Sequence, residues 1–135
     1  MKKVLFLLPL LTVLLVFSGC SDDGEPEFSL VGKTYAAFNY SAYDLFGEKY
    51  DVYKVWRFIS DTEVEQSARE NSPTGDFIGD IETGTYILDY PNLEVKILDG
   101  ISNNSYECEF IDENTFRCYW YNVTGDKEPH EFIKQ

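Results

Sequence analysis

The residues of this chain best able to do chemistry are its three cysteines, Cys20, Cys108 and Cys118, and its one histidine, His130. A structural metal site needs about four ligands, more than Cys108, Cys118 and the distant His130 supply. No serine or cysteine stands beside His130 in sequence to form a nucleophile and base. We therefore expect no catalytic residues, no metal and no cofactor, so the protein is not expected to be an enzyme.

Cys20 follows a segment typical of an export signal. Two lysines precede an almost unbroken apolar run over Val4–Phe17, shorter than the roughly 20 residues that span a bilayer. Two small residues then stand directly before Cys20. The stretch resembles a bacterial lipobox, and the resemblance implies that residues 1–19 are a cleaved signal helix and that Cys20 carries the lipid. The alternative is an ordinary secretory signal that contains a cysteine.

Residues 20–27 form an acidic tether, which resembles the export signal that follows the lipidated cysteine in surface lipoproteins of Bacteroidota. The resemblance implies an outer-membrane lipoprotein whose mature part faces outside the cell; the periplasmic face is the alternative. Each buried methylene of an acyl chain contributes about 0.8 kcal/mol, so two or three chains anchor a protein stably. The membrane is therefore an expected partner through the lipid on Cys20.

Charge and composition bound the rest of the chain. It has 24 acidic and 11 basic residues, a formal net charge of −13. Such a surface repels phosphates, which excludes nucleic acid as a partner. Ten Tyr, ten Phe and two Trp give too much apolar content for a disordered chain. Residues 28–135 are long enough for one domain with a core.

Alternating apolar residues predict strands throughout that domain, separated by turns at short spacing. The longest irregular stretch is expected over Glu70–Thr83. Such a pattern favours an all-β fold, an antiparallel barrel or a sandwich. Gly32 and Tyr35 resemble the opening of lipocalin-like barrels, in which a short helical turn closes one end. The expected fold is an up-and-down barrel of about eight strands. The expected strands are 33–42, 50–59, 63–69, 84–90, 93–98, 105–111, 115–122 and 130–134.

The last long hairpin can be checked by counting. With Asp112–Asn114 as a three-residue turn, Ile111 faces Thr115 and Cys108 faces Cys118. Directly opposed residues have β-carbons about 4.5–5.5 Å apart, so a disulfide requires the closer, non-hydrogen-bonded kind of pair. Cysteine pairs in exported proteins are usually bonded. Two free buried thiols are the alternative.

The aromatic residues allow two kinds of binding. One set of inward-facing rings could line a barrel cavity for a small apolar or amphipathic ligand, or could instead fill a closed core. A second set on the opposite parity, Tyr53, Tyr119 and Tyr121, could contact a protein partner or a glycan. The lead hypothesis is a cell-surface binding module with a ligand in the barrel. The alternative is a filled barrel that acts as a surface interaction protein; the oligomeric state stays open. The candidate cavity-lining residues are Trp56, Phe58, Tyr106, Phe110, Phe116 and Trp120.

Overall fold

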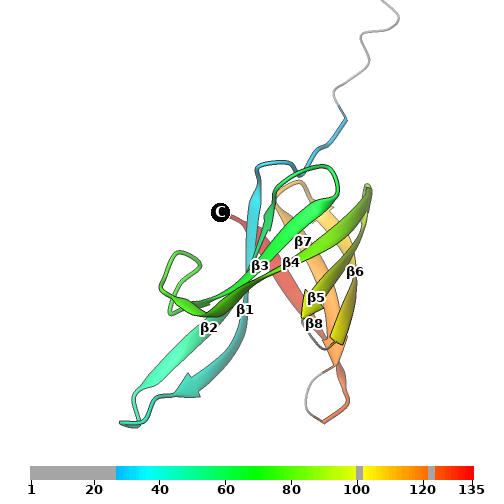
Figure 1. Cartoon of the computed structure of the whole chain (residues 1–135). Coiled ribbons are helices and arrows are strands. Elements are labelled where there is room, and N and C mark those ends of the chain that lie inside the picture. The colour runs from blue at the N-terminus through cyan, green and yellow to red at the C-terminus, as the bar shows by residue number, and fades with distance from the viewer. Residues whose placement is uncertain (1–26, 100–101, 122–123) are drawn as a thin grey trace, which may run out of the picture.

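Eight consecutive strands pair antiparallel, each with the next, and β1 pairs with β8 to close a barrel (Figure 1). The computed structural model describes residues 27–99, 102–121 and 124–135. The predicted up-and-down barrel of eight strands is confirmed, while the predicted signal helix, Cys20 and nearly all of the tether lie outside the described residues. The strands are β1 (Thr34–Tyr43), β2 (Lys49–Phe58), β3 (Glu63–Glu70), β4 (Phe77–Asp89), β5 (Asn92–Asp99), β6 (Ser102–Asp112), β7 (Thr115–Tyr121) and β8 (Lys127–Lys134).

The predicted irregular stretch over Glu70–Thr83 is wrong in its second half, because β4 already begins at Phe77. The ladder between β3 and β4 steps from Gln66↔Glu82 to Ala68↔Ile78, so β4 carries two extra residues at this point. Gly79 takes a φ of 72° there, a conformation in which glycine lacks the steric cost of a side chain. The extra residues interrupt the alternation of inward-facing and outward-facing residues, so the sequence pattern does not predict a strand at this point.

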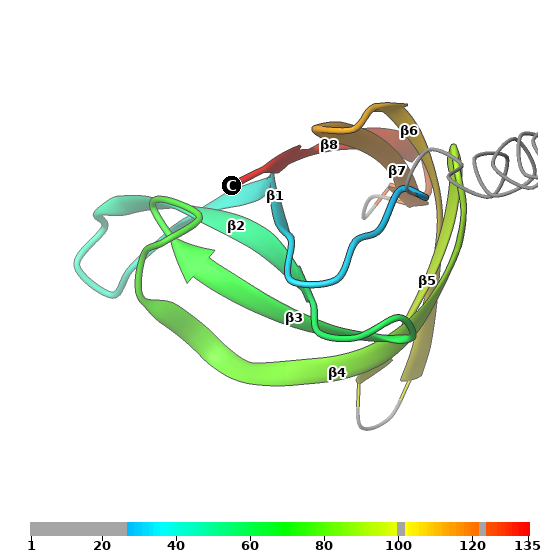
Figure 2. The same ribbon diagram turned by 90° about the horizontal axis from the view of Figure 1, so that it is seen from above.

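One end of the barrel is closed by the segment before β1. This segment crosses the opening in the view along the barrel (Figure 2). The side chain of Leu30 is buried in the core, and the Gly32 amide donates to the Phe58 carbonyl at 2.9 Å. The helical turn implied by the lipocalin resemblance is absent from residues 27–33; a hydrogen-bonded turn at Val31–Gly32 does the closing. This end is called the plugged end.

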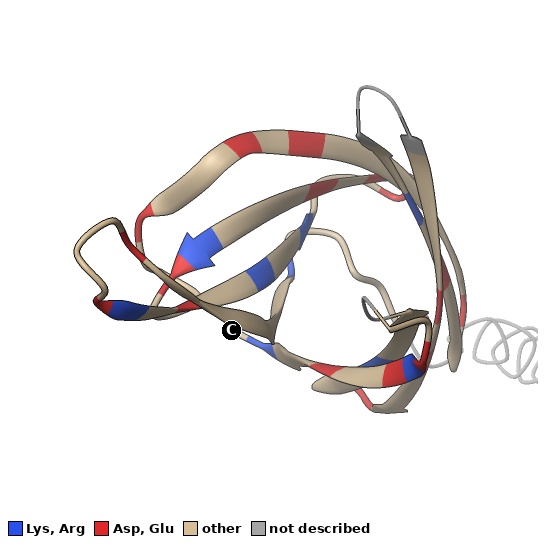
Figure 3. Cartoon of the chain, turned by 90° about the horizontal axis from the view of Figure 1, so that it is seen from below, with Lys and Arg blue, Asp and Glu red and all other residues tan. Residues whose placement is uncertain are grey.

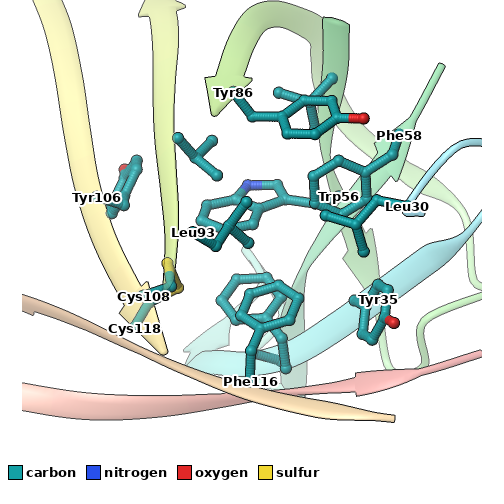
Figure 4. Close-up of a cluster of buried hydrophobic side chains, with 14 of the residues drawn as sticks. Leu30, Tyr35, Trp56, Phe58, Tyr86, Leu93, Tyr106, Cys108, Phe116 and Cys118 are labelled. Atoms are coloured by element: carbon teal, nitrogen blue, oxygen red, sulfur yellow. A yellow bond between two sulfur atoms is a disulfide. The ribbon is translucent and has the colours of Figure 1, made fainter. Parts of the chain in front are cut away.

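The core fills the barrel next to the plugged end. Trp56 lies at the centre of a cluster of buried apolar side chains contributed by several strands (Figure 4). Its ring stacks on Phe132 at a centroid distance of 4.3 Å, and Phe132 stacks on Phe116 at 4.9 Å. These three side chains are fully buried, so apolar burial and ring stacking hold opposite walls of the barrel together.

The predicted disulfide between Cys108 and Cys118 is confirmed. The two residues are directly opposed in the β6–β7 ladder, with Cα atoms 4.2 Å apart. This short separation fits the predicted non-hydrogen-bonded pair. The turn differs locally: Asp112 faces Thr115, and Ile111 is the extra residue of a bulge. The cysteines keep the predicted register because the bulge lies between them and the turn.

The barrel is weakly closed along one seam. β1 pairs with β8 at only two positions, Tyr35↔Lys134 and Ala36↔Ile133, and the strands then diverge. The far part of the β1–β2 hairpin therefore leaves the barrel wall on one side while β7 and β8 continue on the other (Figures 1 and 2). The end of the barrel beyond this divergence is called the mouth.

No helix in the part of the chain that the structure describes has the length and apolar character needed to cross a bilayer.

Candidate functional site: the mouth of the barrel

The six predicted cavity residues divide between core and mouth. Phe58 is fully buried, and Phe110 packs against Phe116 at 5.1 Å, so these rings and Trp56 belong to one packed cluster of buried side chains. Tyr106 is also a buried member of this cluster, 5.3 Å from Trp56, and the partly buried Trp120 packs against Tyr106 at 5.8 Å on the side toward the mouth. The structure thus joins five of the six in the core and leaves Trp120 at its border with the mouth.

Lys54 is the central polar residue of the mouth. Along β2 it lies on the same face as the buried Val52 and Trp56, two residues from each, so its side chain enters the barrel. The ammonium lies 4.3 Å from the ring centroid of Trp120 and 4.9 Å from that of Tyr106, whose hydroxyl is 3.4 Å away. The two rings therefore hold the cation by cation–π contact.

The ammonium of Lys54 has no ion-pair partner in the part of the chain that the structure describes. Two ion pairs occur among the described residues, Glu94–Lys96 and Arg117–Glu131, and neither includes Lys54. Burial lowers the pKa of Lys54 to about 8, and the more distant Glu82 carboxylate opposes this in part. Near neutral pH the group is still mainly protonated, so a positive charge is kept inside a partly dehydrated barrel.

A chain of hydrogen bonds fixes the wall next to Lys54. The indole Nε1 of Trp56 donates to the side-chain oxygen of Gln66 at 2.8 Å, and the amide nitrogen of Gln66 donates to Glu82 at 2.6 Å. The amide is thereby held in one orientation, and the Glu82 carboxylate is already bonded. Glu82 compensates Lys54 at a distance without neutralising it through contact.

His130 forms the opposite side of the mouth. Its ring stacks on Trp120 with centroids 3.4 Å apart and planes 10° apart. Burial lowers the pKa of His130, and the positive charge of Lys54 lowers it further, while a hydrogen bond to the backbone of Phe38 opposes the shift. The imidazole is therefore neutral near pH 7. Because Trp120 stacks on His130 and also has the Lys54 ammonium over its ring, its indole is held in place between these two side chains.

A pocket of about 230 Å³ opens beside these residues, between β2, β3 and β4. Lys54, Gln66 and Glu82 line it together with Ile78. The displaced residues of β4 around Gly79 shape its outer wall. The volume is below the usual range of sites for drug-sized ligands, so the pocket suits a small molecule or one end of a larger molecule.

The second predicted set of aromatic residues is scattered. Tyr121 is 71% exposed and Tyr119 is 40% exposed, whereas Tyr53 is half-buried against Phe38. Lys127 lies over the Tyr119 ring at 5.3 Å. Among the described residues, no cluster of three or more His, Cys, Asp or Glu side chains could hold a metal ion.

Sequence reasoning missed the polar half of the site, which consists of Lys54, Gln66, Glu82 and His130. Two of these residues carried a signal. Lys54 occupies the same parity as Val52 and Trp56, and Gln66 the same parity as Val64, so alternation places both inside. Charged and amide side chains are seldom buried, and an inward parity at such residues therefore marks a site.

Comparison with families of proteins, with curated proteins and with solved structures finds no match to this chain.

Proposed function

We propose that the protein is a lipid-anchored binding module of the cell envelope, whose barrel takes the charged end of a small amphipathic monocarboxylate at its mouth. The observation that carries this proposal is Lys54, a partly buried cation held between two rings without an ion-pair partner among the described residues. A bound carboxylate would supply the missing counter-charge in a medium where such a pair is stronger than in water.

The charge around the mouth limits the ligand. Acidic residues are spread around the barrel wall in the view from the mouth (Figure 3), and Asp80 and Glu82 line the same pocket as Lys54. A phosphate or another polyanion would meet these carboxylates at close range. A single negative charge matched to Lys54, followed by an apolar body, fits the arrangement better.

The apolar body has two surfaces to contact. Ile78 and Ala68 line the pocket, and Lys54 lines it with them. The deeper space is taken by the packed core, so the ligand binds at the mouth and does not reach Trp56. This depth distinguishes the proposal from a ligand buried in the centre of the barrel.

Fluorescence titration of residues 27–135 tests the proposal, with 2-naphthoate as the probe and 2-naphthalenemethanol as its neutral analogue. Saturable binding of the carboxylate with at least tenfold weaker binding of the alcohol is expected. Lys54→Met should abolish the preference and Lys54→Arg should retain part of it, with circular dichroism confirming the fold of each variant. Equal affinity of the wild type for both probes would refute the monocarboxylate site, as would a Lys54→Met variant that still prefers the carboxylate. Either result would favour a filled barrel that acts through its surface.

The anchor is tested separately, in cells that express the whole chain. Metabolic labelling with an alkyne fatty acid should mark the protein, and Cys20→Ala should lose the label and leave the membrane fraction. Protease added to intact cells then separates the two faces: digestion supports surface exposure, and protection supports the periplasmic face. An unlabelled wild-type protein would contradict the lipoprotein assignment.

A further inference from the structure

The free part of β1 presents an unprotected strand edge. Beyond Ala36 no ladder pair joins β1 to β8 among the described residues, whereas β1 stays paired with β2 as far as Tyr43. The segment Ala37–Tyr43 is called the β1 edge. An edge of this kind offers unpaired backbone groups that can add another strand.

The direction of these backbone groups follows from the hairpin turn. The amide of Asp44 donates to the carbonyl of Glu48 at 2.9 Å, so these two form a hydrogen-bonded pair. Hydrogen-bonded and non-hydrogen-bonded pairs alternate along an antiparallel ladder. The backbone groups of Ser41 and Tyr43 therefore point away from β2, toward the open edge.

The β1 edge is chemically unlike the strand that it faces across the seam. β1 (Thr34–Tyr43) has no charged residue, in a chain with 24 acidic residues. β8 has charged side chains and Pro129, the devices by which edge strands normally avoid further pairing. The β1 edge also exposes aromatic side chains: Tyr40 is 52% and Tyr43 70% exposed. The turn beyond it presents Leu45 and Phe46 almost fully to solvent.

We propose that the β1 edge is a dimer interface, at which two copies of this chain pair β1 with β1 antiparallel about a two-fold axis. A second copy is the occupant that the charge pattern favours, because an uncharged strand can meet itself without placing like charges opposite one another. The nearest acidic residues lie outside β1: Asp44 and Glu48 stand in the turn beyond Tyr43, and Asp51 lies on β2. In the dimer the two β2 strands are three strand spacings apart, about 14 Å, which exceeds the Debye length at physiological salt.

The pairing also covers the exposed aromatic residues. Tyr40 lies on the same face as Val52, the inner face of the hairpin, whereas Ser41 and Tyr43 lie on the outer face. The added strand of the second copy then partly covers these tyrosines on both faces of the extended sheet. Backbone hydrogen bonds fix the direction and the covered aromatic side chains contribute burial.

Light scattering on the full chain in mild detergent tests the interface from micromolar to millimolar protein. A concentration-dependent dimer is expected for the wild type. Ser41→Pro removes the amide that points to the open edge and should raise the dissociation constant at least tenfold. Ser41→Ala is the matched control: it removes the same hydroxyl and its 2.6 Å hydrogen bond to Asp51 but keeps the amide, so it should still dimerise. A wild type that is monomeric throughout, or a Ser41→Pro variant that dimerises normally, overturns the proposal.

Crosslinking in membranes gives a second measurement that does not depend on the folding of the proline variant. Ser41→Cys in the full chain should yield a covalent dimer with a short bis-maleimide. Ile87→Cys on β4, which is 65% exposed, is the control for random collision. Equal crosslinking at both positions overturns the proposal, as does the capture of a different protein at Ser41→Cys in place of a second copy.

Discussion

The buried charge of Lys54 should make the stability of the barrel depend on pH. Its pKa is lowered from the ordinary value of 10.5 to about 8, and desolvation is the main cause. Between these two values the unfolded chain holds a proton that the folded chain has released. Because the unfolded state binds more protons in this window, the free energy of unfolding rises with pH there.

The magnitude follows from the size of the shift. Each pKa unit corresponds to about 1.4 kcal/mol, so the protonated ammonium costs the folded state about 3 kcal/mol at neutral pH. Most of this cost is relieved by about pH 10, which gives a gain of about 2 kcal/mol for the wild type. Burial raises the pKa of Tyr35 to about 12 and also raises that of Tyr86, so ionisation of the unfolded tyrosines lowers stability above about pH 10. The pH series for the free energy of unfolding should therefore end at about pH 10.

Urea denaturation of the wild type and of Lys54→Met at several pH values is the assay. Methionine keeps most of the side-chain volume without the charge, so the variant should be more stable than the wild type at neutral pH and should lose the rise toward alkaline pH. The disulfide stays oxidised in all samples. Parallel pH profiles for the two proteins would refute the reasoning, because they would show that the ammonium of Lys54 is not desolvated in the folded state.

Three further perturbations test the packing. Reduction of Cys108–Cys118, which closes a short loop, should lower the free energy of unfolding by about 2–3 kcal/mol in urea, and an unchanged midpoint would contradict the structure. Gly84→Ala would place a Cβ in steric overlap with the carbonyl oxygen of Lys96, so we expect a loss of about 1–3 kcal/mol by thermal denaturation; a neutral substitution would mean that β4 and β5 are further apart. Leu30→Ala should cost about 2–5 kcal/mol, and a smaller loss would show that the plugged end contributes little.

The architecture was predictable because alternation of apolar residues survives in most of the strands. Cys108 and Cys118 illustrate this: counting from the turn placed them opposite one another, and the pairing is observed. The first and last residues of a strand were harder to predict from the sequence wherever the strand is irregular. The two extra residues of β4 around Gly79 break the period, and the sequence pattern there is that of a loop.

The candidate site was predictable only in part, for a physical reason. The inward parity of the aromatic residues was read correctly, but parity does not say whether rings pack on one another or line a space. Trp56, Phe116 and Tyr106 belong to the packed core, whereas the partly buried Trp120 lies at its border with the mouth. The divergence of β1 from β8 decides where the core ends, and it depends on pairing between the two ends of the chain. Local sequence patterns carry no information about such a long-range pairing.

The fold and the proposed site are linked through this divergence. Continued pairing of β1 with β8 beyond Ala36 would bring the strands together at the level of Phe38, whose backbone lies near His130. The open seam leaves the β1 edge without a ladder partner among the described residues. One departure from a regular barrel thus shapes two features, the mouth that contains Lys54 and the edge proposed to pair with a second copy. A variant that restores the seam should therefore impair both ligand binding and dimerisation, whereas Lys54→Met should impair only the former.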